Sequence, residues 1–267
     1  MNNRINNCFA KLKMDQKKAF IAYISAGDPD LSSTIDITLR LEDSGVDIIE
    51  LGLPFSDPLA DGRVNQEAST RALNAGATFE GVMDSISKIR TKSSIPIVIY
   101  AYMNPLISRG FEYSIKSGAD AGADAFLLLD LPVEESKPYR GALSKNKVDT
   151  IQLITPTTPD YRMKKIVNCA SGFVYCVSRE GVTGMQDSLA LGAKDLVSRI
   201  KSYTDLPVAI GFGIGTPSQA QEAAKIADGV VVGSAIVNDF FNESNNNTGR
   251  SRAATFVKSM VKAVKEV

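Results

Sequence analysis

Eight short apolar runs recur along the chain, about 30 residues apart, as in a repeating strand–helix unit. Most of these runs are continuously apolar instead of alternating, which is typical of parallel strands covered on both faces. Stretches with helical periodicity lie between them, for example residues 34–43, 79–90, 111–117 and 217–227. The order predicts a (β/α)8 TIM barrel. The runs begin near Ala19, Val46, Ile95, Ala123, Val148, Gly172, Leu206 and Gly229.

The length of 267 residues suits this fold, because single-domain barrels of this kind run to about 250 residues. The alternative is an open doubly wound sheet, which usually has fewer strands and a glycine-rich first turn. The turn after the first run, residues 26–29 (AGDP), lacks that glycine pattern. We therefore expect one TIM-barrel domain over residues 1–267, with an N-terminal capping helix in 1–14 and a C-terminal helix in 251–267. The polar stretch 242–249 is predicted as a flexible connector.

Charge and composition narrow the class of protein. Lys plus Arg and Asp plus Glu both number 30, so no basic field favours nucleic acid or a membrane surface. No apolar run reaches the roughly 18 residues of a membrane span, and the N-terminus lacks the apolar core of a signal peptide. The three cysteines show no motif spacing, which indicates reduced thiols. We expect a cytoplasmic protein, with the plastid stroma as an open alternative.

The chain contains no histidine. This excludes histidine general bases, Ser-His-Asp triads and every metal site built with histidine. We expect no metal site of another kind, because no cluster of other metal ligands is visible in the sequence. Proton transfer must therefore depend on carboxylates, tyrosine, lysine or cysteine.

Two carboxylates follow the second apolar run. Glu50 ends that run, and Asp61 closes the loop after it. A buried carboxylate is costly without a partner, and no Lys or Arg lies in the apolar core of any run. Active sites of TIM barrels lie at this end of the strands, so we predict that Glu50 has a raised pKa and transfers protons. A structural ion pair for Glu50 and a plain Asp-Gly turn for Asp61 are the alternatives.

The loop between these carboxylates is unusually apolar, with Pro54, Phe55, Pro58 and Leu59. A solvated turn does not need such residues. They favour a lid or a partner surface.

Glycine-rich turns follow the seventh and eighth runs, at residues 211–215 (GFGIG) and 233–236 (GSAI). Glycines let backbone amides approach an anion, and a helix N-terminus favours negative charge. Barrels often bind phosphate in these two loops, so we predict a phosphate site here with Ser234 as a helix N-cap. Glycines that serve only the tight turns are the alternative. The polar segment 178–184 is equally consistent with a mobile active-site loop and a passive one.

Two absences restrict the reaction. Cleavage of a carbon–carbon bond usually needs an electron sink, often a Schiff-base lysine or a metal. No lysine lies in a strand core or at its immediate end, and no cluster of metal ligands is visible in the sequence. A site with two carboxylates and a phosphate clamp must therefore act on a substrate that supplies its own sink.

The segment 50–62 (ELGLPFSDPLADG) resembles the signature of the tryptophan synthase alpha chain family. Further motifs in the family's order span nearly the whole chain, and the first is specific enough to identify the family. They are residues 26–29, 130–135, 178–184, 211–214 and 233–237.

The resemblance implies a barrel enzyme that cleaves indole-3-glycerol phosphate by a retro-aldol reaction into indole and glyceraldehyde 3-phosphate, late in tryptophan biosynthesis. The indole ring would then be the electron sink. By analogy, Glu50 protonates ring carbon C3 and accepts the side-chain hydroxyl proton. Asp61 holds the ring N–H, and Tyr175 assists near the glycerol hydroxyls.

The resemblance also implies the binding residues. The family's phosphate positions correspond to Gly184, Gly213, Gly233 and Ser234, with Phe212 beside them. Its indole pocket corresponds to Tyr23, Tyr102 and Leu129, and Thr183 is the loop residue that meets Asp61.

The chain departs from the family pattern near Asp61. Where the family usually has proline and a bulky aliphatic residue, this chain has Arg63 and Asn65, and Tyr23 replaces a commoner phenylalanine. These changes are expected to alter loop order or pocket polarity.

The family further implies a partner, a pyridoxal-phosphate-dependent beta chain in an α2β2 complex, with the loop 54–59 near the interface. No cofactor is expected in this chain. A stand-alone indole-3-glycerol-phosphate lyase, a non-catalytic regulatory subunit and another phosphate-binding barrel, such as a sugar-phosphate isomerase, remain alternatives.

Overall fold

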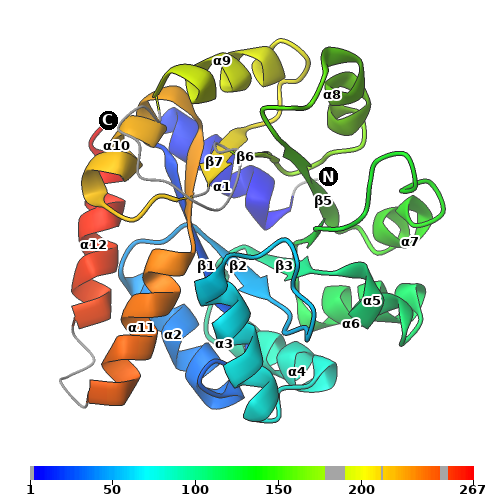
Figure 1. Cartoon of the computed structure of the whole chain (residues 1–267), viewed down its shortest axis with the longest axis vertical. Coiled ribbons are helices and arrows are strands. Elements are labelled where there is room, and N and C mark those ends of the chain that lie inside the picture. The colour runs from blue at the N-terminus through cyan, green and yellow to red at the C-terminus, as the bar shows by residue number, and fades with distance from the viewer. Residues whose placement is uncertain (1–2, 178–189, 212, 247–251) are drawn as a thin grey trace.

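A computed structural model describes residues 3–177, 190–211, 213–246 and 252–267 of the chain. Within these residues, eight parallel strands close into a barrel in sequence order, which confirms the predicted TIM barrel (Figure 1). The strands are β1 (Ala19–Ser25), β2 (Ile48–Gly52), β3 (Ile97–Ala101), β4 (Ala125–Leu128), β5 (Asp149–Ile154), β6 (Val174–Val177), β7 (Val208–Gly211) and β8 (Gly229–Val232).

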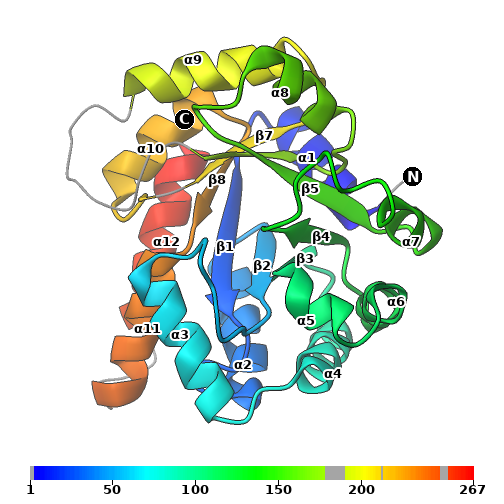
Figure 2. The same cartoon turned by 45° about the vertical axis from the view of Figure 1, so that its right-hand side comes forward.

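Helices form a second layer around the barrel (Figures 1 and 2). They are α1 (Arg4–Met14), α2 (Leu31–Asp43), α3 (Arg63–Asn74), α4 (Phe79–Arg90), α5 (Met103–Ile107), α6 (Phe111–Ala121), α7 (Arg140–Lys145), α8 (Asp160–Val167), α9 (Ala190–Lys201), α10 (Pro217–Ile226), α11 (Ser234–Asn246) and α12 (Arg252–Lys265). In the described ranges, no helix has both the length and the apolar character needed to cross a membrane.

The strands are buried because both of their faces are covered. Alternate side chains point outward to the helices, where residues such as Phe20 and Phe126 are fully buried. The other set points into the barrel, where Ile21, Ile48 and Phe173 belong to one interior cluster. This two-sided burial explains why the runs are continuously apolar in the sequence.

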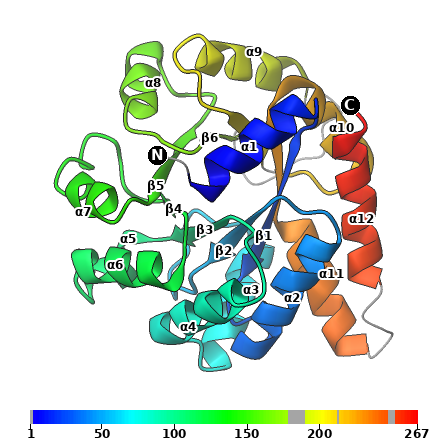
Figure 3. The same ribbon diagram turned by 180° about the vertical axis from the view of Figure 1, so that it is seen from behind.

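The N-terminal helix α1 crosses the end of the barrel where the strands begin, as Figure 3 shows from behind. Its residues Ile5, Phe9 and Leu12 join the interior cluster, and the Phe9 ring lies 5.8 Å from that of Phe173. The helix is therefore a cap on this end, as predicted, and the opposite end of the strands stays available for a site.

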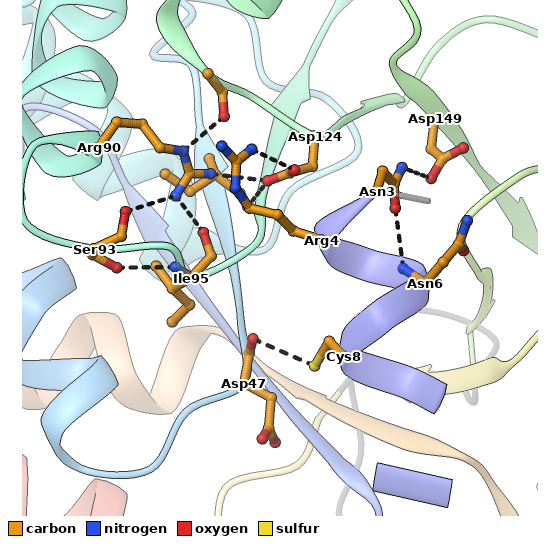
Figure 4. Close-up of polar contacts among 12 residues, drawn as sticks. Asn3, Arg4, Asn6, Cys8, Asp47, Arg90, Ser93, Ile95, Asp124 and Asp149 are labelled. Carbon is orange, nitrogen blue, oxygen red and sulfur yellow. Dashed lines mark hydrogen bonds and ion pairs between the residues drawn. The ribbon is translucent and has the colours of Figure 1, made fainter. Parts of the chain in front are cut away.

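Polar contacts fix the cap to the strand starts (Figure 4). Arg4 pairs with Asp124 at 2.9 Å, and Asn3 donates to the carboxylate of Asp149. Asp124 also accepts from the Arg90 guanidinium and from the backbone N–H of Ile97, both at 2.9 Å. One buried carboxylate thus joins α1, α4 and β3.

Most predicted helix positions agree with the structure, and some predicted bounds need correction. Helix α4 has the predicted bounds, whereas α6 continues beyond residue 117 to Ala121. The stretch 242–249 was predicted as a flexible connector, but α11 extends through its first residues to Asn246. A polar stretch continues a helix when the apolar face before it, here with Ile236, Val237 and Phe240, is already packed on the barrel.

Candidate active site

Glu50 lies inside the barrel on β2, between Tyr23 on β1 and Val98 on β3 in the strand register. Its side chain is 1% exposed, and its Oε1 atom has no hydrogen-bond partner in the described structure. Burial raises the pKa of Glu50 to about 8. The carboxyl group is therefore largely protonated at neutral pH and is free to act on a ligand, which supports the predicted proton-transfer role.

Asp61 lies on the loop between β2 and α3 and is also buried. Its backbone N–H donates to the Pro58 carbonyl, so the residue does close a turn. Its carboxylate, however, points to strand β3, where Oδ1 accepts from the Tyr100 hydroxyl and Oδ2 from the Tyr102 hydroxyl, both at 2.8 Å. Burial raises the pKa of Asp61, and these hydrogen bonds oppose that rise.

Asp61 has two contacts, Tyr100 and Asn65, that the sequence interpretation did not predict. In the sequence, Tyr100 is only the end of an apolar run, and Asn65 is only a departure from the family pattern. The Asn65 side chain also hydrogen-bonds to Asp61, while its Oδ1 atom is buried without a partner in the described part of the chain. The spacing of Tyr100 and Tyr102 was an available signal, because residues two apart on a strand share a face.

Tyr23 reaches from β1 across β2 toward β3. A β-carbon on Gly52 would lie 2.5 Å from the Tyr23 hydroxyl oxygen, so only glycine leaves room for this ring. Beyond Gly52, the Tyr23 ring meets the Tyr100 ring edge-on, with centroids 4.8 Å apart. Ala68 of α3 and Val237 of α11 complete the packing around Tyr23. Its predicted place in a ligand pocket is consistent with this position.

Tyr175 on β6 lies over a glycine of the next strand, as Tyr23 on β1 does. Its hydroxyl lies over Gly211 of β7, in the space that a β-carbon there would occupy. Burial, and next the charge of Glu50, raise the pKa of Tyr175 well above its usual value, and Asp61 contributes as well. The same two carboxylates act on Tyr23. Neither tyrosine hydroxyl makes a hydrogen bond to another described group. These four side chains therefore lie near one another, on the side of the barrel opposite α1.

Leu129 directly follows β4 and packs, half-buried, against the interior cluster that contains Tyr175. Its backbone N–H donates to the Ala101 carbonyl at 3.0 Å, which holds it beside the end of β3. This apolar side chain lies at the same end of the barrel as the tyrosines.

The turns after β7 and β8 leave Gly213 and Ser234 exposed at the same end. Ser234 was predicted as the N-cap of its helix, and this was wrong. The Gly233 carbonyl accepts from Ile236 and Val237 at 2.8 and 3.0 Å, so Gly233 is the N-cap and Ser234 is the first helical residue. The first amides of α11, which have no acceptor within the helix, thus follow Gly233 directly.

Three predicted site residues, Thr183, Gly184 and Phe212, lie outside the described residues. Among the residues that are described, no group of three or more Cys, Asp or Glu side chains could hold a metal ion. The described site therefore combines one protonated carboxyl group, one carboxylate bound by tyrosines, and free amides at a helix N-terminus. Such a set can move protons on a ligand that carries an anionic group.

The comparisons with known proteins agree with each other over the full chain. The family model described as tryptophan synthase alpha chain matches residues 9–265. The tryptophan synthase alpha chain of Geobacter sulfurreducens is 43% identical over 262 residues, which are 98% of this chain and 99% of the relative.

Solved structures show the same likeness. The crystal structure of tryptophan synthase subunit alpha from Legionella pneumophila str. Paris superimposes with a TM-score of 0.92 at 34% identity, and covers 100% of both chains. A chain of tryptophan synthase from M. tuberculosis, in its aminoacrylate-bound form, has a TM-score of 0.88 at 28% identity, with 99% of this chain and 100% of that chain covered.

Proposed function

The chain belongs to the tryptophan synthase alpha chain family and cleaves indole-3-glycerol phosphate in tryptophan biosynthesis, and we propose that Glu50 and Asp61 carry out this carbon–carbon cleavage. The observation that carries the assignment is the state of Glu50. Its carboxyl group is buried, its pKa is raised to about 8, and its Oε1 atom has no hydrogen-bond partner among the residues that the structure describes. A buried acid with an unused oxygen is suited to exchange a proton with bound substrate.

Glu50 first acts as the acid. Its proton goes to ring carbon C3 of the indole, and the ring nitrogen takes up the positive charge. The resulting carboxylate then accepts the proton of the hydroxyl group on the carbon bonded to C3. As the bond between that carbon and C3 breaks, its electron pair returns to the ring, which leaves as neutral indole, and the hydroxyl carbon becomes the aldehyde of glyceraldehyde 3-phosphate. Glu50 ends the cycle protonated, as it began.

Asp61 accepts a hydrogen bond from the ring N–H and stabilises the positive charge that develops there. Each carboxylate oxygen has two lone pairs, so the two tyrosine hydroxyls and the Asn65 side chain leave capacity for this fourth donor. Tyr175, whose hydroxyl has no hydrogen bond to a described group and whose pKa is raised by the charge of Glu50 after burial, assists at the glycerol hydroxyls.

The two ends of the substrate have separate sites in this proposal. Tyr23, Tyr102 and Leu129 line the space for the ring. The phosphate binds at the turns after β7 and β8, through Gly213, Gly233 and Ser234, where the first amides of α11 favour an anion. We keep Gly184 and Phe212 as further phosphate contacts and Thr183 as a loop contact of Asp61, from the resemblance alone.

A beta chain is the proposed partner, in an α2β2 complex. The support is a groove of about 390 Å³ between the loop after β2 and helix α5, lined by apolar residues such as Pro54, Phe55 and Pro105 and by polar ones such as Asn104 and Arg109. Beside it, the side chains of Leu59 and Ile107 are 82% and 48% exposed. The M. tuberculosis match to a chain of tryptophan synthase is consistent with such an assembly. Pyridoxal phosphate belongs to the beta chain, and this chain needs no cofactor for its own step.

The test is an indole-release assay with indole-3-glycerol phosphate, with and without an added beta chain. We expect release in both cases and faster release with the partner. The Glu50→Gln variant should keep its fold and lose at least a hundredfold in turnover, the usual scale for loss of a general acid. Full activity in this variant would remove Glu50 from the assigned role.

A further inference from the structure

Asp61 belongs to a loop, yet its carboxylate is held by the barrel itself. Tyr100 is on β3 and Tyr102 directly follows that strand, and each donates to a different oxygen of Asp61 at 2.8 Å. The backbone is still extended at Tyr102, and residues two apart in an extended chain point the same way, so the two hydroxyls form a fork at the end of β3. Tyr102 also accepts from the Ala60 N–H at 3.0 Å, which ties the loop to the fork.

The Tyr100 ring is itself fixed. Tyr23 meets it edge-on at 4.8 Å, and Gly52 gives Tyr23 the space to do so. A ring held in this way keeps its hydroxyl aimed at Asp61 at little further entropic cost. Contacts therefore connect β1 to β3 across β2, and connect β3 to the carboxylate of Asp61 on the loop.

The fork also acts on the charge of Asp61. Burial favours the protonated acid, whereas hydroxyl donors such as Tyr100 and Tyr102 favour the carboxylate. Burial, and next the charge of Asp61, raise the pKa of Tyr100 well above its usual value, so Tyr100 remains a donor throughout the neutral range. Loss of the Tyr100 hydroxyl would leave Asp61 equally buried with one fewer donor.

We propose that Tyr100 is a positioning residue that, together with Tyr102, holds the Asp61 carboxyl group aimed into the site and favours its carboxylate form before substrate binds. This inference rests on the proposed role of Asp61 as the acceptor of the ring N–H. Tyr100 acts through Asp61 and needs no contact with the substrate.

The test is the pH dependence of kcat/KM for indole release by Tyr100→Phe, which removes the hydroxyl and keeps the ring. The acidic limb should move toward neutral pH by about one unit, the usual effect of one lost charge-assisted hydrogen bond. Activity should recover at higher pH, because Asp61 still ionises there. Tyr102→Phe should shift the limb in the same direction. Tyr113→Phe, on an exposed tyrosine of α6, is the matched control and should leave the limb in place.

A second readout does not depend on turnover. The Asp61 carboxyl carbon can be titrated by ¹³C NMR in the whole chain, with its signal assigned by its absence in Asp61→Asn. Tyr100→Phe should raise the pKa of Asp61 in this titration. An unchanged Asp61 titration together with an unchanged acidic limb would overturn the proposal for Tyr100.

The Asp61→Asn variant distinguishes a failure of the proposed role of Asp61 from a failure of the inference about Tyr100. If this variant loses activity while Tyr100→Phe shifts nothing, Asp61 keeps its role and only the inference about Tyr100 fails. If Asp61→Asn retains full activity, both the role of Asp61 and the inference fail.

Discussion

The hydroxyl group of Tyr23 lies in the space that a β-carbon on Gly52 would need, 2.5 Å from where that atom would stand. The two residues are on neighbouring strands, and Gly52 is the register partner of Tyr100 on the next strand. Glycine at position 52 is therefore a condition for the contact between Tyr23 and Tyr100. The position of the Asp61 carboxylate therefore depends, through Tyr100 and Tyr23, on the absence of a side chain at Gly52.

We expect Gly52→Ala to lower both stability and activity. The added methyl group forces the Tyr23 ring away, and overpacking of this kind costs about 1–3 kcal/mol. Displacement of Tyr23 releases Tyr100, so kcat/KM for indole release should fall as well. Thermal unfolding and the indole assay measure the two effects. Gly141→Ala is the control, because a β-carbon there meets nothing within 4 Å, and it should be neutral or slightly stabilising.

Activity should decline as the pH rises through about 8, the pKa to which burial raises Glu50. Only the protonated acid can give its proton to ring carbon C3, and the proton is lost above this pH. The measurement is kcat/KM for indole release against pH, with circular dichroism at each pH to exclude unfolding. A basic limb that persists unchanged when Glu50 is replaced by another titrating residue, Asp, would count against the assignment.

Glu50→Gln should make the protein more stable at high pH. The pKa of Glu50 is about 8 in the folded chain against 4.5 as its ordinary value, so the folded state binds the proton more tightly. The stability from this protonated group is fully present below the unfolded pKa and is lost as the pH rises through the folded one, at up to about 1.4 kcal/mol per pH unit. Glutamine does not titrate and avoids the loss.

The gap in unfolding free energy between Glu50→Gln and the parent chain should therefore widen from pH 4.5 to about 8 and then level off. Urea unfolding at a series of pH values measures it. A gap that is constant over this range would mean that Glu50 is not desolvated in the folded protein.

The barrel could be predicted from the sequence because its strands are covered on both faces, which gives runs such as residues 97–101 with no polar interruption. Glu50 could be predicted as a candidate because a carboxylate ends one of these runs. Both features are local in the chain.

The Tyr100 contact could not be predicted in the same way. Tyrosine is common at strand ends, and its partner Asp61 lies 39 residues earlier. Only the register of β2 against β3 shows that Tyr100 faces the loop after β2. The error at Ser234 has a similar cause, because an N-cap and a first helical residue differ by one position, which the path of the chain after β8 decides.

Asp124→Asn should destabilise the chain by about 3 kcal/mol, the usual cost of breaking a buried ion pair. Asp124 is 5% exposed and joins Arg4, Arg90 and the Ile97 N–H, so the change leaves charge and a backbone donor poorly paired. Urea unfolding gives the value. Asp120→Asn, which breaks the exposed pair with Lys116, should cost no more than about 1 kcal/mol. Equal effects of the two changes would show that the α1 cap adds little to stability.

If the beta chain docks at the groove beside α5, a charge at the edge of this groove should weaken the complex. Ile107 is 48% exposed at the end of α5, next to the groove residues Asn104 and Ser108. A charge placed there must be desolvated when an apolar surface covers it, so Ile107→Asp should weaken binding of the beta chain by at least tenfold, with an unchanged thermal unfolding midpoint. Titration calorimetry with purified beta chain measures the affinity.

Tyr161→Asp is the matched control, because Tyr161 is 69% exposed on α8, away from the groove. It should bind the beta chain as the parent does. If both variants bind equally well, the partner docks elsewhere. If only Tyr161→Asp weakens the complex, the interface lies on the α8 side of the barrel, and the apolar loop 54–59 needs another explanation.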